Sequence, residues 1–308
     1  MNLINRSFCC ARTLRCFHLV VFSLGMLMSL SALAQSKADI VIVTSVKPLE
    51  LVVKELLGED LLQHIEIKTL LQGQASPHHF ALSVSQARAL ADADLLLWVG
   101  PDFELFLAKI AQSKKTVSFD LAPTQPARET HSTDHHSAHA EDLHLWLSVE
   151  QVSTFAQKLS HSLVALQPMW RESVMGRLQQ FEQGLAALDR DVLAAFSDFQ
   201  ATGFVVFHEA YGPLVERYKL KQLGRLTEVP DEQISAKRVG QLMHQLKGQA
   251  ACMLSEVGEA QQASRYAQML KLPLVNVDIL ASQMEVDSYS EYMRALTRQI
   301  KVCGSATL

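Results

Sequence analysis

Beyond its first 34 residues, the sequence has no apolar run that approaches the roughly 18 residues of a membrane-spanning helix. Residues 1–34 have the order of a secretory signal: three arginines without an acidic residue, an apolar run over 17–30, and Ala32-Leu33-Ala34 as a cleavage motif. An uncleaved membrane anchor is the alternative, although the apolar run is short for a span. We therefore expect an exported protein that is soluble once its signal peptide has been removed.

Cysteine is scarce in the part of the chain that follows the signal. Cys9, Cys10 and Cys16 lie within the signal, so that only Cys252 and Cys303 remain in the mature protein. No cysteine has a lipobox-like position after the apolar run, which argues against a lipid anchor. Because exported proteins fold in an oxidising compartment, we expect the two remaining cysteines to pair. The chain-entropy model values such a bridge at about 4 kcal/mol. Two buried free thiols are the alternative.

The sequence also lacks an excess of basic residues and any short-period tandem repeat. It contains 28 Lys and Arg against 32 Asp and Glu, and the net charge of −4 becomes −7 when the three arginines of the signal are removed. A nucleic-acid-binding surface needs clustered positive charge, so this class of protein is excluded. A net negative charge instead favours the approach of cations.

Short apolar runs alternate with helix-like segments in both halves of the chain. In the first half, we expect strands at 40–44, 65–69, 95–99 and 116–119, with helices at 48–57, 85–91 and 103–111. In the second half, we expect strands at 203–207, 251–254 and 274–277, with helices at 236–246, 260–270 and 289–302. This alternation is typical of parallel sheets with covering helices. The predicted fold class is therefore α/β, with two α/β domains.

A helical stretch separates the two halves. Residues 149–166 predict one helix, and residues 169–196 predict a longer one whose apolar residues recur at spacings of four and three. This longer helix would span roughly 42 Å and could brace two domains, whereas a helix within one domain is the alternative. We therefore divide the mature chain into an N-terminal α/β domain (35–148), a helical connector (149–200) and a C-terminal α/β domain (201–308).

Histidine is concentrated in one stretch. Five of the twelve histidines lie between residues 131 and 144. Most of them fall in a segment over 121–143 that lacks periodicity and that we expect to form a long mobile loop. Imidazole is a common ligand of zinc-like cations, and short His-rich tracts indicate metal capture. We therefore assign auxiliary metal capture to His131, His135, His136 and His139. A solvated polar loop is the alternative.

Four candidate ligands lie at the ends of predicted elements. His208 and Asp278 each follow a predicted strand directly, His78 lies in the loop after the second strand, and His144 leads into an apolar segment. In open α/β sheets, ligands bind beyond the carboxyl ends of the strands. Three imidazoles and one carboxylate satisfy a four-coordinate zinc-like ion. Each residue alone is more often an ordinary polar residue, but their coincidence predicts a metal site in the cleft between the two domains.

A set of ordered motifs extends along essentially the whole mature chain. The motifs are Thr44-Ser45-Val46-Lys47-Pro48, Ala75-Ser76-Pro77-His78-His79-Phe80, Asp92-Ala93-Asp94, Trp98-Val99-Gly100-Pro101, His144-Leu145-Trp146-Leu147-Ser148, Phe207-His208-Glu209-Ala210-Tyr211-Gly212 and Val277-Asp278. With these motifs the chain resembles the cluster A-I periplasmic metal-binding proteins of ABC transporters, and most closely their zinc-uptake members. The His-rich insertion and the positions of Cys252 and Cys303 are also similar to those members, in which the two cysteines form a disulfide.

The resemblance implies that His78, His144 and His208 bind the metal. It also implies that the protein captures Zn²⁺ as its transported ligand and delivers it to the membrane permease of an ABC transporter, without enzymatic chemistry. Some zinc members have a glutamate directly before the first histidine, where this chain has Pro77. The fourth ligand is therefore Asp278 or water. We expect a periplasmic monomer with no nucleic-acid partner.

Three rival functions stay open. A manganese- or iron-binding relative would have the same fold, with two histidines and two carboxylates at its site. A zinc hydrolase would use three histidines and an activated water. Its general base would have to be Glu209, and the sequence has no H-E-x-x-H motif. A metal-dependent surface adhesin is the third rival.

Overall fold

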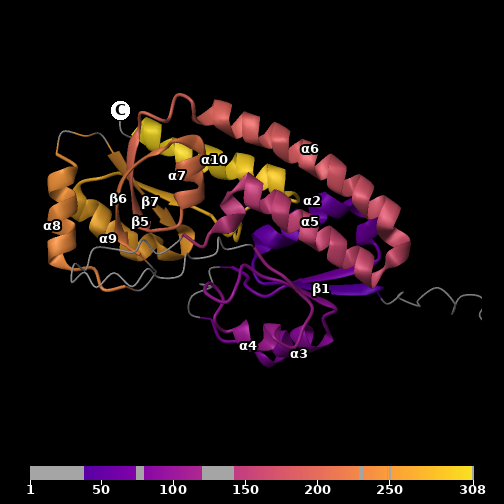
Figure 1. The fold of residues 1–308 in the computed structure, drawn as a ribbon. Coiled ribbons are helices and arrows are strands. Elements are labelled where there is room, and N and C mark those ends of the chain that lie inside the picture. Colours follow the sequence, from indigo (N-terminus) through magenta and orange to yellow (C-terminus); the bar gives the residue numbers. More distant parts are fainter. Residues whose placement is uncertain are drawn as a thin grey trace, which may run out of the picture. The chain divides into compact units, whose positions relative to one another are not determined.

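Two parallel β-sheets form the frame of the structure (Figure 1). The computed structural model describes residues 38–73, 80–119, 142–228, 232–247, 249 and 251–306. Within these ranges, no helix is both long enough and apolar enough to cross a membrane. The predicted signal peptide lies outside the described residues.

The first sheet is formed by the N-terminal half of the chain. Its strands are β1 (Ile40–Thr44), β2 (Ile65–Thr69), β3 (Leu95–Leu97) and β4 (Thr116–Val117), which lie parallel in the order β2-β1-β3-β4. The helices between them are α2 (Lys47–Leu62), α3 (Val84–Asp92) and α4 (Ala108–Ala111). The two central strands, β1 and β3, consist almost entirely of Ile, Val and Leu and are buried along their length, as expected for strands covered on both faces.

The second sheet repeats this arrangement in the C-terminal half. Its strands are β5 (Gly203–His208), β6 (Lys221–Thr227), β7 (Ala251–Glu256) and β8 (Leu274–Val277), parallel in the order β6-β5-β7-β8. The helices of this half are α7 (Gly212–Tyr218), α8 (Ala236–Gln245), α9 (Ala260–Leu270) and α10 (Tyr289–Ala306). In both sheets the chain changes direction between the two central strands, and such a switch point is where open α/β sheets bind their ligands.

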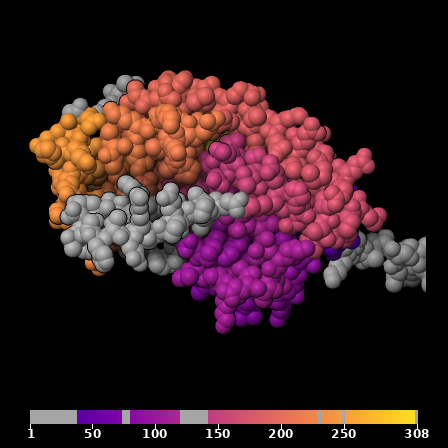
Figure 2. Space-filling model, viewed as in Figure 1, coloured from indigo at the N-terminus to yellow at the C-terminus, as the bar shows by residue number. Residues whose placement is uncertain are grey.

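Helices α5 (Val149–Leu166) and α6 (Arg171–Phe196) connect the two sheets. Three short 3-10 helices are η2 (Leu145–Leu147), η3 (Pro168–Trp170) and η4 (Val257–Glu259). The 26 residues of α6 span roughly 39 Å, and α6 packs against α2 and α5 as well as against α7 and α10. Figure 2 shows α5 and α6 as a magenta-to-salmon surface between the purple N-terminal part and the orange C-terminal part.

One apolar core runs through both halves of the molecule. It contains one face of β1 and β3, one face of β5 and β7, and the buried sides of α2, α5, α6 and α10. The alternation of side chains along a strand separates the two faces: Phe204 and Val206 point into this shared core, whereas Val205 and Phe207 pack with α8 and α9 in a second cluster. The opposite face of the first sheet packs in a third cluster with residues of α3 and α4. The four shared helices therefore hold both sheets at once.

Hydrogen bonds also join the two halves. The indole of Trp146 donates to the carbonyl of Ile279, and the hydroxyl of Tyr289 donates to the carbonyl of Trp146. The carboxylate of Glu55 in α2 accepts hydrogen bonds from the backbone amide and the hydroxyl of Ser290 at the start of α10. These polar contacts fix the segment after β8 to the N-terminal half.

The predicted α/β fold class with two parallel sheets and a long linking helix is confirmed. Strand β6 and helix α7 were not predicted. Strand β6 is a partly exposed edge strand without an apolar run, and α7 begins with a Gly-Pro pair typical of turns. The strand predicted at 95–99 ends at Leu97, and the helix predicted at 103–111 is reduced to α4. The domain boundaries given above stay a prediction.

A disulfide joins Cys252 in β7 to Cys303 in α10. Both residues are fully buried, and their Cα atoms are 5.6 Å apart, within the range of ordinary bridges. The bond therefore attaches the last helix to a central strand of the second sheet.

The buried carboxylate of Glu104 organises the turn that replaces the predicted helix. It accepts hydrogen bonds from the amides of Val99 and Gly100 and from the hydroxyl of Ser45. Burial raises the pKa of Glu104 to about 7, although these hydrogen bonds oppose the change. The folded state therefore holds a proton that the unfolded chain releases near pH 4.5.

We expect the metal-free protein to lose stability through Glu104 as the pH rises from about 4.5 to 7, because the ionised form is disfavoured by burial. The loss amounts to about 3 kcal/mol when the change in pKa is converted by linkage. In Glu104→Gln this pH dependence should be absent. Urea unfolding between pH 5 and 8 in the presence of a chelator measures it, with Glu172→Gln on the exposed side of α6 as the control. Parallel stability curves for Glu104→Gln and the unsubstituted protein would contradict the assignment.

Candidate metal centre

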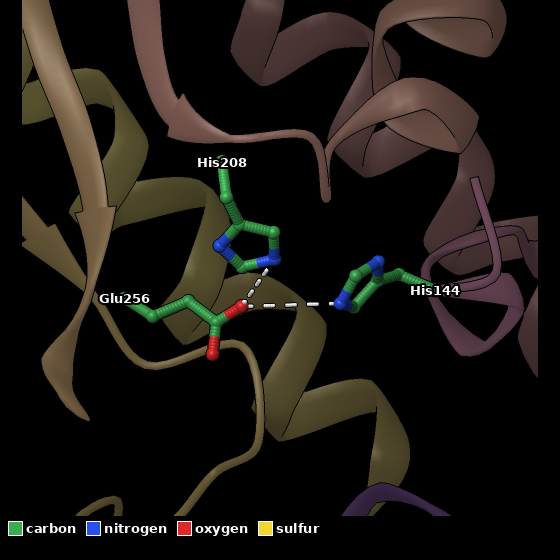
Figure 3. Close-up of side chains that lie close together, drawn as sticks. All are labelled: His144, His208 and Glu256. Atoms are coloured by element: carbon green, nitrogen blue, oxygen red, sulfur yellow. Dashed lines mark ion pairs between the residues drawn. The ribbon is translucent and has the colours of Figure 1, made fainter. Parts of the chain in front are cut away.

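Three side chains from separate segments form a largely buried cluster (Figure 3). His208 is the last residue of β5, Glu256 is the last residue of β7, and His144 directly precedes η2. The parallel register places Val206 opposite Leu254, so His208 and Glu256, each two residues further along, lie side by side. Both therefore lie at the switch point of the second sheet.

The donor atoms of the three residues converge. Glu256 Oε1 lies 3.0 Å from His208 Nε2 and 3.8 Å from His144 Nε2, and one donor atom from each residue lies within 4.8 Å of the others. A tetrahedral zinc-like ion bonds its donors at about 2.0–2.2 Å, which separates neighbouring donors by roughly 3–4 Å. The observed spacing therefore fits a single shared cation.

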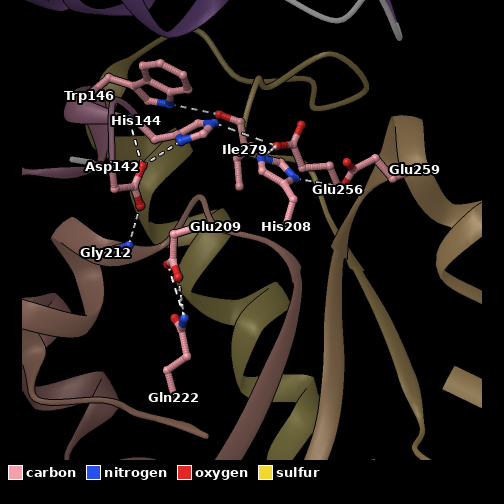
Figure 4. A network of polar contacts seen from close by, with 10 residues as sticks. All are labelled: Asp142, His144, Trp146, His208, Glu209, Gly212, Gln222, Glu256, Glu259 and Ile279. Atoms are coloured by element: carbon pink, nitrogen blue, oxygen red, sulfur yellow. Dashed lines mark hydrogen bonds and ion pairs between the residues drawn. The ribbon is translucent and has the colours of Figure 1, made fainter. Parts of the chain in front are cut away.

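Each imidazole is oriented by a carboxylate on its other nitrogen (Figure 4). Asp142 Oδ1 lies 2.7 Å from His144 Nδ1, and Glu259 Oε2 lies 2.9 Å from His208 Nδ1. A carboxylate only accepts hydrogen bonds, so each Nδ1 carries a proton, and in the neutral form of each imidazole Nε2 keeps its lone pair for a metal ion. Outer carboxylates of this kind are typical partners of metal-bound histidines.

Aromatic rings hold His144 in place. The rings of Phe103 and Trp146 pack edge-on against its imidazole, at centroid distances of 5.3 and 5.1 Å. His144 and His208 are only 3% and 2% exposed. Bulk water therefore does not compete for the donor atoms.

The surroundings of this cluster are rich in negative charge. Burial lowers the pKa of His208, but the charges of Glu256 and Glu259 and the hydrogen bond that His208 donates to Glu259 overcome this effect and raise the pKa to about 9. Three carboxylates, those of Asp142, Glu256 and Glu259, surround two imidazoles. Such a group favours a bound cation, which in the metal-free protein is a proton on His208.

Asp278, predicted as a ligand, has other partners in the structure. Its Oδ1 accepts hydrogen bonds from the amide and hydroxyl of Ser282, and its Oδ2 accepts from the amides of Gln283 and Met284. The carboxylate therefore organises the turn after β8. The role of Asp278 as a ligand stays a prediction, and Glu256 is the carboxylate that the structure brings to the two imidazoles.

Glu209, the general base that a hydrolase would need, is directed away from His144 and His208 and toward Gln222 (Figure 4). Its carboxylate accepts hydrogen bonds from Gln222 and forms an ion pair with Arg225, both in β6. Glu209 therefore attaches the edge strand β6 to the end of β5.

Several predicted residues lie outside the described residues. They are the proposed ligand His78, its neighbour His79, and the four histidines assigned to auxiliary capture, His131, His135, His136 and His139. Glu256, Asp142 and Glu259 were not identified from the sequence. Glu256 lies two residues beyond the predicted strand 251–254, so the strand-end criterion that selected His208 and Asp278 applies to it as well.

Several known proteins to which this chain is similar are named as zinc-uptake or zinc-binding proteins. The family model described as "Zinc-uptake complex component A periplasmic" matches residues 42–303. The high-affinity zinc uptake system protein ZnuA of Yersinia pestis is 28% identical over 295 residues, covering 86% of this chain and 92% of that protein. A crystal structure of ZnuA matches with a TM-score of 0.70 at 20% identity, covering 87% of this chain and 99% of its own. The periplasmic zinc binding protein TroA from Treponema pallidum matches with a TM-score of 0.70 at 19% identity, covering 86% and 98%. At these identities the two structures show a shared fold.

The charge arrangement predicts the protonation of His208. In the metal-free protein, the proton that His208 holds stabilises the fold below about pH 6.5 as long as Glu256 is ionised, and this stabilisation is lost as the pH rises through about 9. Glu256→Gln removes the largest cause that raises the pKa of His208, so its pKa should fall well below 9. Imidazole ¹⁵N NMR during a pH titration measures this, with Glu216→Gln on the exposed side of α7 as the control. An unchanged His208 titration in Glu256→Gln would contradict the geometry.

Proposed function

Because the chain belongs to the family of periplasmic zinc-uptake components, we propose that it captures Zn²⁺ outside the cytoplasm and delivers it to the membrane permease of an ABC transporter. The family membership confirms the resemblance found in the sequence motifs. Export by a cleaved signal peptide, a periplasmic location and a monomeric state belong to the same proposal.

The convergence of His144 Nε2, His208 Nε2 and Glu256 Oε1 carries this proposal. Imidazole nitrogens favour zinc over magnesium or calcium, and a buried carboxylate neutralises part of the charge of the dication. His78, taken from the family motif, supplies the third imidazole in the proposed site. Glu256 then takes the fourth position that the sequence had assigned to Asp278 or water.

The metal is proposed as cargo and not as a catalyst. A hydrolase would need a general base beside the metal-bound water, and Glu209 is bound to Gln222 and Arg225 instead. Asp142 and Glu259 bind the Nδ1 atoms of the two histidines. The proposed third imidazole, that of His78, also distinguishes this site from a site with two histidines and two carboxylates, which would suit manganese or iron.

Single substitutions test the ligand set. His208→Ala and Glu256→Gln should each weaken Zn²⁺ binding, the histidine variant by at least about 100-fold, because loss of an outer-shell partner already costs 10–100-fold. Asp278→Asn should weaken binding less than Glu256→Gln does. Competition with a chromophoric chelator measures the affinities, and His161→Ala on the exposed side of α5 is the control. A larger loss in Asp278→Asn than in Glu256→Gln would return the fourth position to Asp278.

Deletion of residues 129–140 tests the role of the His-rich loop. A mobile loop loses conformational entropy when it closes around an ion, so its sites should be weak. The deletion variant should keep one tight Zn²⁺ site and lose the additional weak ones, as measured by calorimetric titration. Loss of the tight site would show that the loop contributes a primary ligand.

A further inference from the structure

We infer that Asp142 is a positioning residue of the zinc site. Its carboxylate selects the metal-binding tautomer of His144. The same carboxylate binds the amide of Gly212, and it thereby attaches the segment around His144 to the segment that follows His208. This inference rests on the proposed function for its zinc-binding consequence. Its structural part, the attachment of the two segments, concerns the metal-free protein as well.

The carboxylate of Asp142 has three donors around it (Figure 4). Its Oδ1 accepts the backbone amide of His144 at 3.0 Å and faces His144 Nδ1 at 2.7 Å. Its Oδ2 accepts the backbone amide of Gly212 at 2.6 Å. The side chain of Asp142 is only 9% exposed, so water does not replace these partners.

Both carboxylate oxygens of Asp142 must act as hydrogen-bond acceptors, Oδ1 toward His144 and Oδ2 toward Gly212. An asparagine at position 142 has nearly the same shape but one amide nitrogen, which only donates. If that nitrogen faces His144 Nδ1, the ring must carry its proton on Nε2 and cannot bind the metal there. If it faces Gly212 instead, two N–H groups oppose each other and the contact between the segments is lost. Asp142→Asn therefore removes one of the two effects in either orientation.

Gly212 leaves the space that this contact requires. A Cβ atom at position 212 would lie 2.9 Å from Asp142 Oδ2 and 3.0 Å from Asp142 Cβ, closer than real Cβ contacts. Gly212 begins α7, four residues after His208, and α7 packs against η2, which follows His144. The carboxylate therefore spans two segments that carry ligands and come from opposite halves of the chain.

Glu259 provides a matched comparison. It binds His208 Nδ1 as Asp142 binds His144 Nδ1. However, Glu259 and His208 both belong to the C-terminal half, so this pair orients a ligand without joining the two halves. Glu259→Gln should weaken zinc without changing the contact at Gly212.

A double-mutant cycle tests the inference. We expect Asp142→Asn, Asp142→Ala and Gly212→Ala each to weaken Zn²⁺ about 10–100-fold, the usual cost of losing an outer-shell partner, with faster release in stopped-flow chelator competition. Gly212→Ala made in the Asp142→Ala background should cause a smaller further loss, because the carboxylate that it would strike is absent and only the Cβ of residue 142 remains near it. A cooperative urea transition in each variant would show that the variants are folded.

Hydrogen exchange of the Gly212 amide in the metal-free protein gives an independent measurement. The amide should be protected in the unsubstituted protein and in Glu259→Gln, and should exchange faster in Asp142→Ala. Equal zinc affinity in Asp142→Asn and the unsubstituted protein would overturn the inference, as would an equal cost of Gly212→Ala in both backgrounds. If the unsubstituted protein lacks a tight Zn²⁺ site, the proposed function fails instead, and the exchange measurement still tests the contact.

Discussion

The structure depends on the packing of two sheets against one layer of helices. Helices α2, α5, α6 and α10 bury their apolar sides against β1 and β3 of the first sheet and against β5 and β7 of the second. Because protein interiors are closely packed, such a layer fixes the separation of the two sheets. The carboxyl ends of β5 and β7 thereby lie close enough to the segment before η2 for the side chains of His144, His208 and Glu256 to meet.

The strongest periodic signals in the sequence predicted the central elements of this frame. The apolar run Ile40–Thr44 is buried along its length, and the stripe that includes Phe181 and Leu188 forms the buried side of α6. Elements at the margin were missed, because β6 is partly exposed and has polar side chains that any loop could carry. The alternation of apolar and polar residues in a sequence reflects which side chains are buried. A partly exposed edge strand such as β6 therefore lacks a recognisable apolar pattern.

The site was predictable only in part, for a similar reason. His144 and His208 belong to motifs that identify a family, and the structure brings them together. Glu256 and Asp278 both lie near strand ends, but only Asp278 directly follows a predicted strand, so the sequence led to Asp278 alone. What separates them is the turn over 282–284, whose amides bind both oxygens of Asp278. Such a turn is a property of tertiary structure and has no counterpart in spacing along the chain.

The hydrogen bonds between the halves determine how this molecule can move. A hinge-like separation of the two sheets would break the contacts of Trp146 with Ile279 and of Glu55 with Ser290, and would expose the shared apolar core to water. Exposure of apolar surface costs roughly 25 cal/mol for each Å², so wide opening is disfavoured. Under the proposed function, the exchange of an ion with solvent therefore has to proceed without a wide separation of the two sheets. The described residues form one frame with a shared core, and the proposed site lies within that frame.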